Sequence, residues 1–268
     1  MEGEQTENLL ANRDIEEIEE EEMKLKEKIW SETKKMWKIA GPAIFTRLST
    51  FGISIITQAF IGRIGSIELA AYSLVGTVLL RFGNGVLIGM ASALETTCGQ
   101  SYGAKQYHML GIYRQRSWIL LFSCCLLLLP MFFFATPILM ALGQDPEISR
   151  VAGHISLWLI PILFSYIPSY TCQMFLQAQT RNNITAYLAA FSLSFYLLLS
   201  WLLTVKYKFG VHGAMLSAIL AYWILNLGQL LYVICGSCSE TWKGFSMLAF
   251  KDLWSIFRLS LTSGVMLW

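Results

Sequence analysis

Long runs of apolar residues, separated by short polar segments, dominate the chain from residue 36 onward. An α-helix needs about 20 apolar residues, at a rise of about 1.5 Å each, to cross a hydrocarbon core of roughly 30 Å. Six runs meet this requirement, and we predict transmembrane helices over residues 36–61, 69–93, 117–134, 151–176, 186–205 and 213–235. A seventh helix is expected to begin near Leu253. The pattern therefore predicts an all-α integral membrane protein.

The first 35 residues differ from the rest of the chain. Twelve of the eighteen Asp and Glu residues lie between Glu2 and Glu32, and a segment of this composition is expected to stay solvated. Its acidic start also does not match a cleavable signal peptide. We therefore predict three parts: an acidic cytoplasmic tail (1–35), a six-helix transmembrane lobe (36–235), and a cytoplasmic loop with the truncated start of the seventh helix (236–268).

The composition supports a membrane location and gives no support for a nucleic-acid partner. The chain is 55% hydrophobic and only 14% charged, so a soluble domain of this size would have too little polar surface to cover itself. Beyond residue 35, fourteen Lys and Arg stand against six acidic residues. These basic residues cluster between the apolar runs, which reports orientation in a lipid bilayer and gives no indication of nucleic-acid binding.

The distribution of basic residues between the loops predicts the orientation. Thirteen Lys and Arg lie before the first helix and in the second, fourth and sixth loops, including Arg114 and Arg116 in the second loop. The opposite loops contain four, and the pair Lys206 and Lys208 is the weakest point of the assignment. The positive-inside rule therefore places the N-terminus in the cytoplasm. The glycosylation sequon that begins at Asn183 would then also be cytoplasmic.

Two arginines lie near the middle of predicted helices, where a charge is costly. Arg47 is in the first helix and Arg81 in the second. They could face an aqueous cavity and attract anionic or hydroxyl-rich solutes, or they could bond to neighbouring helices and only fix the packing. Together with three polar residues on the helices they are our candidates for substrate binding: Arg47, Gln58, Arg81, Asn84 and Gln173.

Glu95 is the only acidic residue associated with the predicted helix bodies. We regard it as a candidate for coupling transport to an ion. A structural role, holding the loop that follows the second helix, stays open.

The sequence gives no reason to propose an enzyme. Its three histidines are far apart, and neither a phosphate-binding loop nor metal-ligand spacing is present. We predict no catalytic residue, no metal and no cofactor.

Three segments of the chain resemble the plant members of the multidrug and toxic compound extrusion (MATE) family. They are Thr46–Gly52, Gln58–Gly65 with the following Glu68-Leu-Ala-Ala, and Gly89–Ala104. The third is similar to the family's signature between helices 2 and 3, and the resemblance covers nearly everything from residue 36 onward.

The resemblance implies a fold and a function. Family members have twelve helices in two six-helix lobes, and they export or sequester organic solutes and xenobiotics in exchange for protons or sodium. The chain resembles the N-terminal lobe plus the start of the seventh helix, and a proton is the expected coupling ion. The resemblance also implies that the proton-binding acids of plant members lie on the seventh helix and beyond, while the helix-1 aspartate of many bacterial members matches Thr57.

The sequence leaves several questions open. A single lobe could belong to a working secondary transporter, or it could be a non-transporting half that pairs with or regulates full-length membrane partners. The expected location is the vacuolar or the plasma membrane, and the transported solute is not indicated.

Overall fold

Six helices that are long and apolar enough to cross a membrane make up most of the computed structural model, which describes residues 2–179, 181–237, 241–242, 244–250 and 253–267. They are Leu25–Gly62, Ser66–Gly103, Tyr107–Phe133, Pro146–Ala178, Asn182–Lys206 and Gly210–Cys235. Each contains or closely matches one of the predicted spans. The prediction of an all-α membrane protein with six spans is therefore confirmed.

Several spans are built from more than one helical segment. The elements in order are α1 (Glu2–Gly62), α2 (Ser66–Val75), the π-helix η1 (Gly76–Leu80), α3 (Arg81–Gly103), α4 (Tyr107–Phe133), α5 (Ala135–Ala141), α6 (Pro146–Ala178), α7 (Asn182–Ser200), the π-helix η2 (Trp201–Lys206), α8 (Gly210–Tyr232), the π-helix η3 (Val233–Ser237), the 3₁₀-helix η4 (Met247–Phe250) and α9 (Leu253–Leu267).

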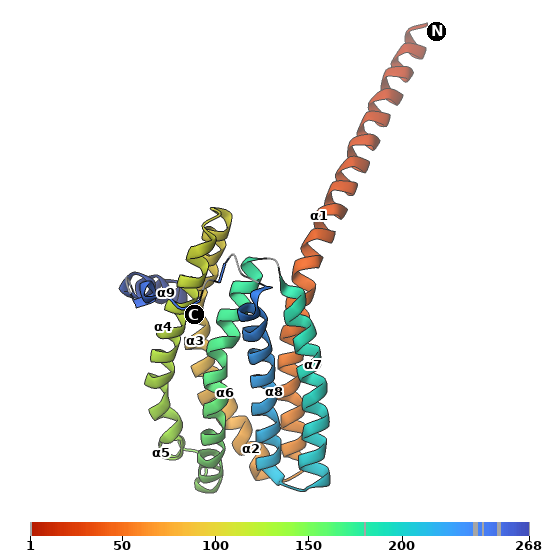
Figure 1. Ribbon diagram of the computed structural model, residues 1–268. Helices are drawn as coiled ribbons and strands as arrows, with labels where there is room; N and C mark the ends of the chain where they lie inside the picture. The colour runs from red at the N-terminus through yellow and green to blue at the C-terminus, as the bar shows by residue number, and fades with distance from the viewer. Residues whose placement is uncertain (1, 180, 238–240, 243, 251–252, 268) are drawn as a thin grey trace.

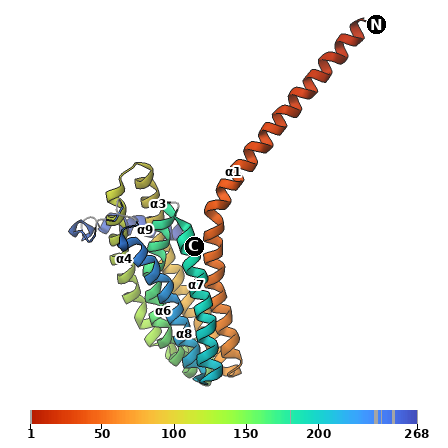
Figure 2. The same cartoon turned by 45° about the vertical axis from the view of Figure 1, so that its right-hand side comes forward.

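The N-terminal part of α1 projects well beyond the bundle, while its C-terminal part packs within it, mainly against α7 (Figures 1 and 2). We call the side from which it projects the tail side, and the opposite side the far side. The helix runs without a break across the predicted boundary between residues 35 and 36. The division of the chain into residues 1–35, 36–235 and 236–268 stays a prediction.

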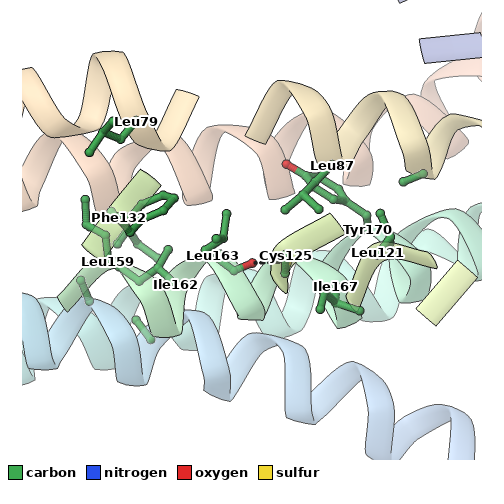
Figure 3. Close-up of a cluster of buried hydrophobic side chains, with 14 of the residues drawn as sticks. Leu79, Leu87, Leu121, Cys125, Phe132, Leu159, Ile162, Leu163, Ile167 and Tyr170 are labelled. Carbon is green, nitrogen blue, oxygen red and sulfur yellow. Dashed lines mark hydrogen bonds between the residues drawn. The ribbon is translucent and has the colours of Figure 1, made fainter. Parts of the chain in front are cut away.

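Helix α6 lies at the centre of the bundle and contacts α2, α3, α4, α5, α7 and α8 (Figure 1). Its inward face carries Leu159, Leu163 and Ile167, which pack against side chains such as Leu87 of α3 and Phe132 of α4 (Figure 3). These side chains are at most 8% exposed. Lipid tails are as apolar as leucine, so close packing rather than water exclusion holds such helices together.

The third span begins at Tyr107, ten residues before the predicted start at residue 117. Arg114 and Arg116 therefore lie within α4, and the prediction that they belong to a loop is wrong. Arg114 is fully buried, and its Nη2 atom donates a hydrogen bond to Sγ of Cys172 at 3.1 Å. Its guanidinium carbon lies 4.7 Å and 4.9 Å from the ring centroids of Trp118 and Trp242. A desolvated arginine over aromatic faces gains up to about 2 kcal/mol for each such contact.

The segment after α8 docks onto the tail-side end of α4. Gln115 holds it with both ends of its amide: Nε2 donates to the carbonyl of Gly244 at 2.9 Å, and Oε1 accepts from the backbone N–H of Ser246 at 2.8 Å. Arg116 Nη2 donates to the carbonyl of Leu248 at 3.1 Å. The polar residues near the start of α4 thus find hydrogen-bond partners in a segment more than 120 positions later in the chain, and we call residues 241–242 and 244–250 the docked segment.

Helix α9 begins at Leu253, where the sequence predicts a seventh helix. It packs across α3 and α4 on the tail side, at a steep angle to the bundle (Figures 1 and 2). The two helices approach closely at a pair of glycines, because a Cβ atom built on Gly89 would lie 3.1 Å from the Cα of Gly264. Small residues allow this kind of close approach between membrane helices.

Candidate functional site

A cavity of about 640 Å³ lies within the spanning part of the bundle and is bounded by α1, the α2–η1–α3 span, α6 and α8. Polar side chains line much of it, and we call it the central cavity. Its lining residues are Arg47, Thr50, Phe51, Ser54, Thr57, Gln58, Tyr72, Ser73, Gly76, Thr77, Leu80, Arg81, Asn84, Gly85, Ile162, Tyr166, Tyr170, Ala218 and Tyr222.

Helical periodicity explains how two apolar spans present a polar face to the cavity. On α1, the lining residues Arg47, Thr50, Ser54 and Gln58 recur at intervals of three or four, which places them on one side of a helix. The second span follows the same rule from Ser73 to Asn84. Its π-helix η1 lies immediately before Arg81, and π-turns inside α-helices are frequent at functional sites.

Four tyrosines and Phe51 form the aromatic part of the lining. Tyr166 stacks on Tyr170 one turn away, with ring centroids 5.7 Å apart and an interplanar angle of 26°. Tyr166 also meets Tyr222 of α8 edge to face, with centroids 6.4 Å apart. The fourth, Tyr72, lies on α2 and is 7% exposed. Tyrosine offers both an apolar ring and a hydrogen-bonding hydroxyl.

Hydrogen bonds connect the lining across helices. The hydroxyl of Tyr170 donates to Oδ1 of Asn84, which joins α6 to α3. The guanidinium of Arg47 interacts with the same hydroxyl. Arg47 therefore lies on the cavity and also contacts a neighbouring helix, so both interpretations of this residue describe part of its environment.

A second pair of helices is joined at Thr57. Its hydroxyl is within 2.7 Å of the Tyr196 hydroxyl on α7 and donates to the carbonyl of Ile53 at 2.7 Å. The hydroxyl of a threonine does not release a proton near neutral pH.

A smaller pocket of about 480 Å³ adjoins the central cavity on the tail side. Arg47 and Phe51 line both spaces. The smaller pocket also receives Glu95 from α3 and Gln173 from α6. Within the part of the chain that the structure describes, the Glu95 carboxylate makes no hydrogen bond or ion pair. No such contact therefore supports a role for Glu95 in holding the loop that follows the second helix.

The structure thus brings the predicted site residues into two connected spaces. Arg47, Gln58, Arg81 and Asn84 line the central cavity, whereas Gln173 and Glu95 line the smaller pocket. The four tyrosines and the small hydroxyl residues of the lining were not predicted from the sequence. Helical spacing could have found some of them, since Thr50, Ser54 and Thr77 lie three or four residues from a predicted position and Tyr170 lies three residues from Gln173. No predicted position lies within four residues of Tyr72, Tyr166 or Tyr222.

The described residues contain no group of three or more His, Cys, Asp or Glu side chains that could hold a metal ion.

Comparison with known proteins identifies the family. The MatE family model matches residues 42–202, which is more than half of the chain. The chain belongs to the MatE family. Two relatives in Arabidopsis thaliana are Protein DETOXIFICATION 21, which is 62% identical over 249 residues, and Protein DETOXIFICATION 23, which is 60% identical over 267 residues. The matches cover 93% and 99% of this chain but 50% and 54% of those proteins. The MatE chain spans about half the length of these relatives.

Solved structures agree with this assignment. The crystal structure of the eukaryotic MATE transporter AtDTX14 matches 88% of this chain and 53% of its own, with a TM-score of 0.83 and 32% identity. The Vibrio cholerae MATE transporter VcmN in its bent form has a TM-score of 0.73 at 18% identity, which shows a common fold alone. The expectations of a MATE-type six-helix lobe, of a multi-pass membrane protein and of a protein that is not an enzyme are confirmed.

Proposed function

We propose that this MatE chain is the N-terminal lobe of a secondary antiporter that exports or sequesters organic solutes and xenobiotics in exchange for protons. The observation that carries the proposal is the central cavity, a space of about 640 Å³ with many polar lining residues that is bounded by four of the six apolar membrane spans. Intramembrane charges and polar groups are costly and mark substrate or ion pathways. The volume falls within the range of about 300–1,000 Å³ that is typical of small-molecule sites.

The candidate residues divide into two roles under this proposal. Arg47, Gln58, Arg81 and Asn84 contact the solute in the central cavity, and Gln173 contacts it in the adjoining pocket. Glu95 exchanges the proton, because it lines the same pocket as Arg47 and its carboxylate has no partner among the described residues. Arg47 would then line both the cavity that binds the solute and the pocket in which Glu95 exchanges the proton.

A flux measurement tests the proposal. The 268-residue chain and a version extended by a second lobe are reconstituted into vesicles, and a proton gradient is imposed. We expect gradient-driven solute movement by the extended protein and a smaller flux or none by the single lobe, since alternating access requires one lobe to rock against the other. Absence of proton-driven movement in the extended protein would contradict the proposal. Inactivity of the single lobe alone would favour the alternative, a half that pairs with or regulates full-length partners.

The orientation that we propose, with the tail side in the cytoplasm of a vacuolar or plasma membrane, makes a separate prediction. The sequon at Asn183 lies at the start of α7 on the tail side, and the Asn183 side chain is exposed. Glycosylation enzymes act on the lumenal side, so the sequon should stay unmodified in eukaryotic cells. A mobility shift after glycosidase treatment that is abolished by Asn183→Gln would show that the orientation is reversed.

A further inference from the structure

We propose that the central cavity selects organic anions that carry an aromatic ring. This inference rests on the proposed function of the cavity as a solute site. It begins with charge: the described lining residues include two arginines and no acidic residue. Both arginines are exposed, so their guanidinium groups are accessible to a solute that enters the cavity.

Neither arginine has a counter-charge of its own. Arg47 and Arg81 make no ion pair with any residue that the structure describes. Glu95 lines the adjoining pocket, which it shares with Arg47, but it does not line the central cavity and makes no ion pair with Arg47. A solute carboxylate, sulfonate or phosphate would provide the missing negative charge, and guanidinium groups bind such anions through charge-assisted hydrogen bonds.

The network around Arg47 prepares it for this role. Asn84 accepts the proton of the Tyr170 hydroxyl, and the oxygen of that hydroxyl keeps a lone pair for the guanidinium of Arg47, with which it interacts. The contact positions the guanidinium without neutralising it, since a phenol carries no charge in this bond. Arg81 lies one turn of helix from Asn84 and on the same cavity, so the two arginines flank the polar network.

The tyrosines of the lining indicate that the solute carries an aromatic ring. Tyr170, Tyr166 and Tyr222 form a continuous aromatic wall through one stacked and one edge-to-face contact. Such a wall suits a flat aromatic ring. Tyrosine faces also attract cations, but a cation in this cavity would be repelled by both arginines. The combination therefore favours an aromatic anion over an aromatic cation of the same size.

Two xanthene dyes of similar size and opposite charge make a direct test. The full chain is placed in nanodiscs of zwitterionic phosphatidylcholine, and the binding of fluorescein, an anion at pH 8, and rhodamine 6G, a cation, is measured by fluorescence polarisation against empty nanodiscs. We expect fluorescein to bind at least roughly tenfold more tightly than rhodamine 6G, which corresponds to one charge-assisted hydrogen bond.

Three variants complete the experiment. Arg47→Gln and Arg81→Gln should each weaken fluorescein binding by roughly tenfold or more while leaving rhodamine 6G binding unchanged or stronger. Arg63→Gln is the matched control, because Arg63 is an exposed arginine outside the cavity lining, and it should have no effect. Equal binding of both dyes, preference for rhodamine 6G, binding of neither, or an equal response to all three variants would overturn the inference.

The outcome is separate from that of the flux measurement. Selective binding of fluorescein without proton-driven flux would leave the anion selectivity in place and remove the antiport function. Proton-driven flux combined with preference for the cationic dye would remove the anion selectivity and leave the antiport function in place.

Discussion

An arginine at Phe191 should prevent stable insertion of α7, whereas an arginine at Tyr207 should be tolerated. Phe191 is 60% exposed near the middle of the fifth span, where its side chain would face lipid. An arginine at the centre of a membrane helix costs about 2.5–3.5 kcal/mol on insertion scales. The measurement is the yield of monodisperse protein from membranes, as seen by fluorescence-detected gel filtration.

Tyr207→Arg is the matched control. Tyr207 is exposed to a similar extent, at 57%, but it lies in the far-side loop beyond the span. A helical bundle in water would accept both substitutions equally well, because both positions are on its surface. Equal yields of the two variants would therefore contradict the assignment of α7 as a membrane helix.

Substitution of Gly111 by valine should release the docked segment from α4. A Cβ atom at Gly111 would lie 2.9 Å from the carbonyl oxygen of Thr241, which is closer than real Cβ contacts. The backbone of the docked segment must then move, and overpacking of this kind typically costs about 1–3 kcal/mol. We expect trypsin to cut within residues 241–252 roughly tenfold faster, since a change of about 1.4 kcal/mol alters the open population tenfold.

Gly99→Val is the control for this experiment. Gly99 is also helical, but no heavy atom lies within 4 Å of a Cβ built on it. It therefore reports the effect of a β-branched residue on the helix without a clash. Unchanged proteolysis of the Gly111 variant, or equal acceleration in both variants, would show that this contact does not hold the segment in place.

Hydropathy was sufficient to predict the six spans because their number depends only on apolar length. It was not sufficient for their ends. The polar run that includes Arg114, Gln115 and Arg116 is typical of a loop, yet its side chains are buried against the docked segment and neighbouring helices. A pattern within one segment cannot reveal a partner more than 120 residues away. The same limit concealed the steep packing of α9 across α3.

Only some residues of the candidate site could likewise be predicted from the sequence. Charged and amide side chains inside apolar runs are conspicuous, and Arg47, Arg81 and Asn84 all line one cavity. Tyr166 and Tyr222 were missed because a tyrosine in an apolar helix reads as part of the apolar face. Which polar residues share a space depends on how the helices pack, so Gln173 and Glu95 could be separated from the others only by the structure.

The proposed solute site requires that the central cavity be open to water within the membrane spans. Cysteine labelling in membranes tests this requirement, in a background where Cys238 and the exposed Cys235 are replaced by serine. Thr77 lines the cavity, and Leu198 is 71% exposed on the outer face of α7. We predict that a charged methanethiosulfonate reagent modifies Thr77→Cys readily and Leu198→Cys at least tenfold more slowly, because only the first thiol meets water and can ionise. Modification of Leu198→Cys with Thr77→Cys protected would show that the central cavity is closed to water.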